Sequence, residues 1–113
     1  MTLYKGMVQE GSKRARALGY PTVNITQDDP SVSGVYAAVV RIDKTIYHAV
    51  AFADPSRKLL EAHVFGLSEG VYGRQLSIEL VEKIRETATF SDDETLKSAI
   101  DDDIAKAREY FKN

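Results

Sequence analysis

The amino-acid sequence predicts a small all-β protein, a closed barrel of about six short strands with one helix at its C-terminal end. Up to about residue 85, apolar residues alternate with polar ones, the period typical of half-buried strands. From about residue 92, apolar residues instead recur every three or four positions, as on one face of a helix. Turn-forming residues separate the apolar runs, and closure into a barrel would protect so small a sheet from exposed edges.

Composition limits the classes of protein that the chain can be. With 113 residues, of which 43% are hydrophobic, we expect residues 1–113 to form a single domain. The absence of cysteine excludes disulfides, thiolate metal sites and thiol nucleophiles. A formal net charge of −2 disfavours a nucleic-acid or anionic membrane surface. Because the sequence shows no signal-peptide pattern and no apolar run near about 18 residues, we expect a cytoplasmic protein without a membrane span.

The predicted strands occupy about residues 3–85 and are joined by short connections. Each is a run of apolar and β-branched residues bounded by turn residues: 3–8, an extended segment at 22–24, 34–42, 45–52, 60–65 and 75–84. The segment 34–42 is the clearest strand, and Asp43-Lys44 predicts a tight hairpin to the following strand. The turn residues at 28–34 and 53–58 interrupt the sheet.

The predicted helix covers about residues 92–112. Ser91 and Glu94 form a capping box, with serine at the cap and glutamate three residues later. The apolar residues that follow at helical spacing are Leu96, Ile100, Ile104, Ala107 and Phe111. We expect the three aspartates at 101–103 to lie mostly on the solvent-facing side, since runs of like charge are usually solvated.

The segment 11–24, Gly-Ser-Lys-Arg-Ala-Arg-Ala-Leu-Gly-Tyr-Pro-Thr-Val-Asn, is the most informative part of the chain. Its glycine and cations are Gly11, Lys13, Arg14 and Arg16. Cationic side chains neutralise phosphate oxygens, and a glycine lets the backbone approach a ligand closely. Thr22 and Asn24 add neutral oxygen atoms that suit Mg²⁺, and an extended backbone would point both to one face. The segment indicates a nucleotide-plus-magnesium site, although a solvated loop followed by an ordinary turn remains open on these residues alone.

The order of motifs resembles the riboflavin kinase (flavokinase) family, found alone in eukaryotes and as the C-terminal half of bacterial bifunctional FAD synthetases. The motifs are Leu-Gly-Tyr-Pro-Thr-Val-Asn at 18–24, Gly-Val-Tyr-Ala at 34–37, Glu-Ala-His-Val-Phe at 61–65 and Tyr-Gly at 72–73. The resemblance extends from Gly6 to about Tyr110 and implies a six-stranded Greek-key β-barrel with a C-terminal helix. It also implies transfer of the ATP γ-phosphate to the 5′-hydroxyl of riboflavin, giving FMN and ADP, with Mg²⁺.

The resemblance implies roles for individual residues. Glu61 matches the catalytic glutamate, which would accept the hydroxyl proton, while Thr22 and Asn24 match the residues that hold Mg²⁺. The residues expected to contact the nucleotide are Gly11, Lys13, Arg14, Arg16, Gly19, Pro21 and Thr22. Those expected to border the flavin are Tyr72, Gly73 and Arg85. Adenylyl transfer to make FAD is not expected of these residues and would need a fused or separate adenylyltransferase domain.

The sequence departs from the family pattern in three places. An Asn-Ile-Gly-x-x-Pro-Thr-Phe-like segment is replaced at 51–61 by a shorter stretch without that Asn and Gly. Ala15 stands at a loop glycine, and Thr87 and Thr89 stand where the family has glutamate and lysine. These changes leave open a flavin- or nucleotide-binding module of the same fold that has no activity. A small barrel that binds nucleic acid is least favoured, because the aromatic residues alternate as core residues do and the net charge is negative.

Overall fold

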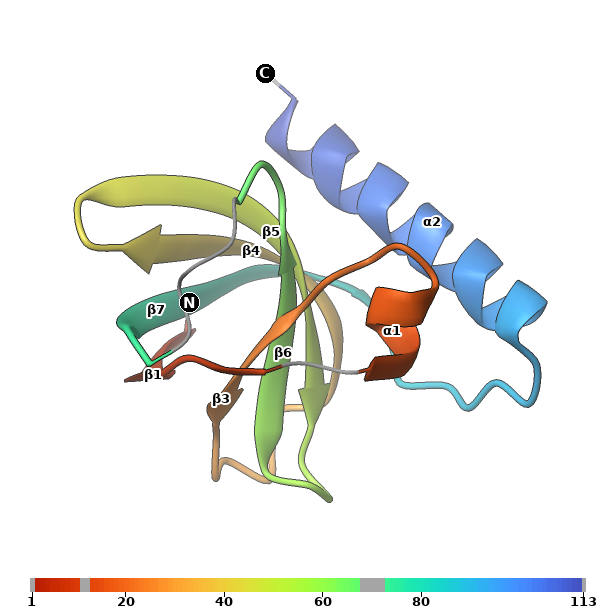
Figure 1. Cartoon of the computed structure of the whole chain (residues 1–113), viewed down its shortest axis with the longest axis horizontal. Helices are drawn as coiled ribbons and strands as arrows, with labels where there is room; N and C mark the ends of the chain where they lie inside the picture. The colour runs from red at the N-terminus through yellow and green to blue at the C-terminus, as the bar shows by residue number, and fades with distance from the viewer. Residues whose placement is uncertain (1, 11–12, 68–72, 113) are drawn as a thin grey trace.

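The computed structural model of the chain describes residues 2–10, 13–67 and 73–112, which form one antiparallel sheet and two helices (Figure 1). The strands are β1 (Thr2–Met7), β2 (Gln9–Glu10), β3 (Val23–Thr26), β4 (Gly34–Ile42), β5 (Thr45–Asp54), β6 (Leu59–Val64) and β7 (Gln75–Arg85). The helices are α1 (Lys13–Ala17) and α2 (Asp93–Phe111). The predicted strands and the long helix are confirmed to within one or two residues at most of their ends, whereas α1 was expected to be a loop.

The sheet closes on itself through its first strand. The strand order is β1-β7-β4-β5-β6-β3-β2, and β1 and β2 are separated only by Val8. One continuous stretch therefore pairs with β7 along its first half and with β3 along its second. At the crossing, a Cβ on Gly6 would lie 2.9 Å from Ile25 Cβ, so glycine is required for β1 and β3 to approach. The predicted six-stranded Greek-key barrel is confirmed, with its first strand divided in two.

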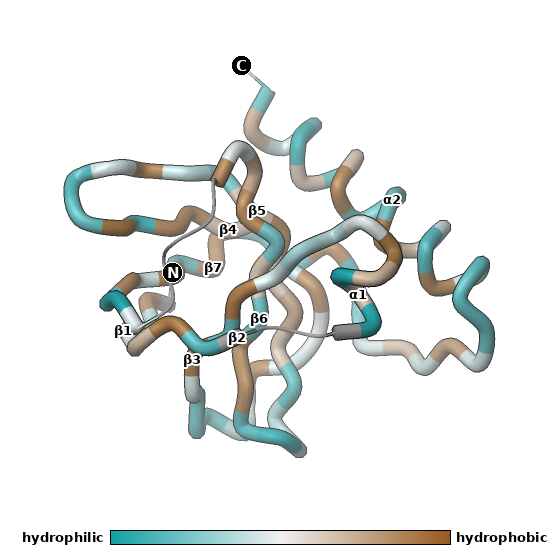
Figure 2. The backbone as a smooth tube through the Cα atoms, in the orientation of Figure 1, coloured by the Kyte–Doolittle hydropathy of each residue, from teal (hydrophilic) through white to brown (hydrophobic). Residues whose placement is uncertain are grey.

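Alternate residues of the strands fill the barrel interior. Ile25, Val40, Leu60 and Ile78 are the largest apolar side chains with no exposure in this cluster. In Figure 2 the hydrophobic colour runs along the strands, whereas the tips of the β4–β5 and β5–β6 turns are hydrophilic. Because strand side chains alternate between faces, the residues between these core positions lie on the outside of the barrel.

Helix α2 covers part of that outer face and forms a second apolar cluster. Val35, Ala37 and Val50 from the sheet are buried there with Ala107 of the helix. Phe52 and Phe65 pack against this cluster, as expected for aromatic residues that alternate along strands. The barrel therefore has apolar contacts on both faces of β4 and β5, and α2 shields part of the outer face from solvent.

Two details of α2 differ from the sequence prediction. The N-cap is Asp92, not Ser91: its Oδ1 accepts from the Thr95 N–H at 2.8 Å and its Oδ2 from the Thr95 hydroxyl at 3.0 Å. A carboxylate at this position also interacts favourably with the helix dipole. Asp101 and Asp102 are exposed as predicted, but Asp103 is only 1% exposed, so the prediction is wrong for Asp103.

The short helix α1 ends in a hydrogen-bonded cap. Gly19, with φ of 97°, donates its N–H to Arg16 O at 3.0 Å, and the Tyr20 N–H bonds to Ala15 O at 2.9 Å. This is the Schellman pattern, which requires a residue in the left-handed region and so favours glycine. The cap turns the chain from α1 directly into Pro21 and β3.

Candidate active site

One row of side chains crosses the outer face of the barrel. Asn24 of β3 is paired with Glu61 of β6, Glu61 with Phe52 of β5, Phe52 with Val35 of β4, and Val35 with Arg85 of β7. Residues directly opposite one another in antiparallel strands share a face, so these five side chains lie side by side. The register therefore brings the predicted metal ligand, the predicted base and the predicted flavin-side arginine onto one surface.

Thr22 completes the group at its β3 end. It lies two residues before Asn24, and its hydroxyl donates to Glu61 Oε2 at 2.6 Å. Thr22 is 4% exposed and Asn24 8% exposed, while Glu61 is half-buried. This hydrogen bond uses the single proton of the Thr22 hydroxyl, and a hydroxyl oxygen can also act as an acceptor or as a metal ligand.

The donor set fits a hard cation. Thr22, Asn24 and Glu61 bring a hydroxyl, an amide and a carboxylate to one wall, and Mg²⁺ prefers such oxygen ligands together with substrate phosphates. Among the described residues, no three histidine, aspartate or glutamate side chains gather into a metal site of their own. A magnesium ion held here would therefore depend on the phosphates of a substrate as well as on the protein.

These residues line a cavity of about 400 Å³ on the outer face of the barrel. Its walls come from α1, the β5–β6 turn, the segment 86–92 and the start of α2, and its polar groups include Thr22, Asn24, Glu61 and Arg85. In Figure 1 the segment 86–92 leaves β7 and passes below α1 before α2 begins. The cavity lies within the size range usual for small-molecule sites.

Arg85 is fixed in the cavity wall by a buried carboxylate. Its Nε and a terminal nitrogen donate to the two carboxylate oxygens of Asp103 at 2.8 and 2.7 Å. The guanidinium also lies 5.6 Å from the centroid of the Phe90 ring. The sequence interpretation missed this role of Asp103 in fixing Arg85, although its spacing of three after Ile100 and four before Ala107 places it on the buried stripe.

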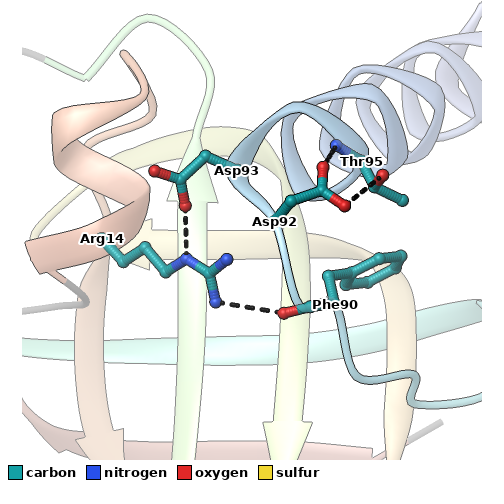
Figure 3. Close-up of polar contacts among 5 residues, drawn as sticks. All are labelled: Arg14, Phe90, Asp92, Asp93 and Thr95. Carbon is teal, nitrogen blue, oxygen red and sulfur yellow. Dashed lines mark hydrogen bonds and ion pairs between the residues drawn. The ribbon is translucent and has the colours of Figure 1, made fainter.

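Arg14 of α1 also lines the cavity and is bound to the start of α2 (Figure 3). Its Nε donates to Asp93 Oδ1 at 2.8 Å and a terminal nitrogen to Phe90 O at 3.4 Å. The neighbouring Asp92 accepts the cap bonds from Thr95, chiefly from its backbone N–H, and these bonds lower the pKa of the Asp92 carboxyl. The Arg14 charge thus already has an acidic partner.

Tyr20 makes a second link between the α1 region and α2. Its hydroxyl donates to Asp101 and accepts from Lys97 Nζ at 3.2 Å. The hydrogen bond from Tyr20, followed by that from Lys97, lowers the pKa of the Asp101 carboxyl. Tyr20 and the adjacent His63 both line the cavity, and His63 Nδ1 donates to Pro21 O at 2.9 Å.

The remaining residues expected at the site fall elsewhere or outside the described part. Arg16, Gly19 and Pro21 are exposed and are not among the residues that line the cavity. Gly73 donates its N–H to Val8 O at 2.9 Å, beside the junction of β1 and β2. Gly11, Tyr72 and the side chain of Lys13 lie outside the described residues. Their roles stay predictions.

No helix among the described residues is both long and apolar enough to cross a membrane.

Comparison with known proteins gives both similar sequences and similar solved structures. A bifunctional riboflavin kinase/FMN adenylyltransferase of Haemophilus influenzae is 34% identical over 118 residues, covering 96% of this chain and 38% of the relative. A solved structure titled macrolide-efflux protein from Streptococcus pneumoniae has a TM-score of 0.78 at 26% identity, covering 94% of this chain and 38% of that one. Riboflavin kinase from Trypanosoma brucei shares the fold, with a TM-score of 0.63 at 22% identity over 96% of this chain and 78% of that one.

The chain spans 38% of the length of the Haemophilus influenzae relative. The family model described as Flavokinase: Riboflavin kinase matches residues 2–111, almost the whole of the chain. Together with the barrel and the order of motifs along it, this match shows that the chain belongs to the riboflavin kinase family.

Proposed function

We propose that the chain transfers the γ-phosphate of ATP to the 5′-hydroxyl of riboflavin, giving FMN and ADP. The observation that carries the proposal is the 2.6 Å hydrogen bond between Thr22 and Glu61 in a cavity that Asn24 also lines. A carboxylate beside neutral oxygen ligands is what phosphoryl transfer to an alcohol requires, since the reaction depends on positioning, charge neutralisation and removal of one proton.

In this proposal Glu61 is the general base. The riboflavin hydroxyl gives its proton to the Glu61 carboxylate as the hydroxyl oxygen forms a bond to the γ-phosphorus. The bond from that phosphorus to the β–γ bridging oxygen breaks, and ADP leaves with the bonding electron pair. The hydrogen bond from Thr22 holds Oε2, so it orients the carboxylate toward the reacting alcohol. General-base assistance of this kind contributes about 10²–10⁴ in rate.

Thr22 and Asn24 are the residues proposed to hold Mg²⁺, which when bound would neutralise phosphate charge. Their side chains are almost fully buried, so their oxygen atoms are held in place by the surrounding protein. Such preorganised ligands need little rearrangement when substrate arrives. Arg14, Arg16 and the α1 region are proposed to contact the nucleotide, and Arg85 to border the flavin.

Two wider assignments stay proposals. The adenylyltransferase activity in the name of the Haemophilus influenzae relative is not assigned to these residues, because the riboflavin kinase family model accounts for residues 2–111. We propose instead that a fused or separate domain would convert FMN to FAD. Location in the cytoplasm, where ATP is available, likewise remains a prediction.

Product analysis tests the proposal directly. The chain is incubated with riboflavin, ATP and Mg²⁺, and FMN and ADP are separated by chromatography. We expect equal amounts of FMN and ADP, and neither product when Mg²⁺ is removed by a chelator. Binding of riboflavin and ADP without any FMN would instead indicate the non-catalytic module, and absence of binding to either would contradict both functions.

A further inference from the structure

The β5–β6 turn, residues 55–58, forms the cavity wall in the segment where the sequence departs from the family pattern. Asp54, Ser56, Arg57 and Leu59 of this turn and its flanks line the cavity. Leu59 lies two residues before Glu61, about 7 Å along a strand. The turn is therefore near enough to the Thr22–Glu61 pair for a long side chain to reach a ligand bound there.

The turn has a defined structure. Ser56 Oγ donates to Asp54 Oδ1 at 2.7 Å, and the Arg57 N–H is 3.3 Å from Asp54 O and 3.4 Å from Asp54 Oδ1. The Lys58 N–H bonds to Pro55 O at 3.3 Å, and Lys58 has a φ of 55° that closes the turn. The Asp54 carboxylate thus accepts hydrogen bonds from the Ser56 hydroxyl and the Arg57 N–H, and these bonds hold the backbone of Arg57 at the edge of the cavity.

The three arginines that line the cavity in the described part of the chain differ in their partners. Arg14 is paired with Asp93, and Arg85 with Asp103. The guanidinium of Arg57, by contrast, has no hydrogen-bond or ion-pair partner among the described residues. The same cavity is also lined by the neutral side chains of Thr87 and Thr89. Arg57 is thus the lining arginine whose charge no carboxylate of the described chain neutralises.

From this difference we infer that Arg57 binds the polyphosphate of the nucleotide. The inference rests on the proposed function and adds a residue to it. A guanidinium offers planar paired donors that match phosphate oxygens. Riboflavin is uncharged, whereas a nucleoside polyphosphate carries more negative charge than one divalent cation neutralises. Arg57 supplies the missing positive charge on the wall where the family's Asn-Ile-Gly-type segment is replaced.

The contact is tested by calorimetric titration of the full chain with ADP in the presence of Mg²⁺. The variants are Arg57→Ala, Arg57→Lys and, as a control with the same loss of charge, Lys44→Ala in the exposed β4–β5 turn, which does not line the cavity. Arg57 is exposed and its guanidinium has no partner within the described part of the chain, so its replacement should leave the circular dichroism spectrum and thermal midpoint unchanged.

We expect Arg57→Ala to raise the Kd for ADP about tenfold, the loss of one charge-assisted contact, and to reduce the dependence of binding on salt. Arg57→Lys keeps the positive charge and should lose less affinity for ADP, while Lys44→Ala should bind ADP as tightly as wild type. Binding of riboflavin and of adenosine, which have no phosphate, should be unchanged in every variant. The inference would be overturned if Arg57→Ala changed the Kd for ADP by less than about twofold, or if Lys44→Ala raised that Kd equally. It would also be overturned if Arg57→Ala weakened the binding of adenosine or riboflavin as much as that of ADP.

Parallel assays of FMN formation separate this inference from the proposed function. If the wild-type chain makes FMN, but Arg57→Ala changes neither the affinity for ADP nor the KM for ATP, the result contradicts the inference alone. A chain that makes no FMN, but binds ADP through Arg57, contradicts the function and supports the inference. Failure of the wild-type chain to bind ADP contradicts the role of Arg57 as well.

Discussion

Removing one partner of the Arg85–Asp103 ion pair should destabilise the protein by an amount that depends on which partner is removed. Arg85→Ala leaves a carboxylate of 1% exposure without its two hydrogen bonds. Isolated buried charges cost about 3–5 kcal/mol when a partner is lost. Asp103→Ala leaves an arginine whose side chain is 25% exposed and can still reach water. We therefore expect this variant to lower the free energy of unfolding by about 1–3 kcal/mol.

Urea unfolding followed by circular dichroism measures this asymmetry. The Arg41–Glu79 pair is the control: its atoms are 3.7 Å apart and its side chains are 48% and 23% exposed. Breaking such a surface pair should cost at most about 1 kcal/mol. Because apolar residues can replace a buried ion pair, the double variant Arg85→Met/Asp103→Leu should recover most of the loss caused by Arg85→Ala. A larger loss in Asp103→Ala than in Arg85→Ala would refute the reasoning.

Two further predictions concern the metal ligand and the helix cap. Asn24→Ala should raise the Mg²⁺ concentration needed for half-maximal FMN formation about tenfold or more while leaving riboflavin binding close to wild type, and equal loss of both would contradict the metal role. Asp92→Ala should lower the thermal midpoint by a few degrees at neutral pH, because the Thr95 N–H loses its acceptor. Since the cap bonds lower the pKa of Asp92, their stabilisation is complete above its unfolded pKa of about 4 and is lost as pH falls through the folded pKa. The difference between wild type and variant should therefore shrink below about pH 4, and a difference that grows in acid would contradict this role of the carboxylate.

The strands could be predicted because local pattern and tertiary structure agree there, whereas the roles of the site residues came from the family resemblance and stay predictions. The alternation that defines β3 and β6 also fixes which side chains share the outer face, and register then pairs Asn24 with Glu61. A carboxylate in the middle of an apolar strand, as at Glu61, is explained equally by an outward-facing position, so its assignment to a site depended on the family resemblance.

The rest depended on contacts that sequence patterns do not reveal. Helix α1 has five residues, too few to be stable alone, and contacts such as the Arg14–Asp93 pair hold it in place. Ser91 and Asp92 are both good caps, and only the position of Thr95 decides between them. Arg57 belongs to no motif, so its place on the cavity wall required the fold of the β5–β6 turn.

The central claim is that Glu61 removes a proton in the cavity that it shares with Thr22 and Asn24. The most direct measurement compares steady-state FMN formation by wild type, Glu61→Gln and the control Glu82→Gln, which changes an exposed residue that does not line the cavity. We predict that Glu61→Gln lowers kcat by about 10²–10⁴ with small changes in KM for either substrate, and that Glu82→Gln matches wild type. Glu61→Gln turning over at the wild-type rate would contradict the account.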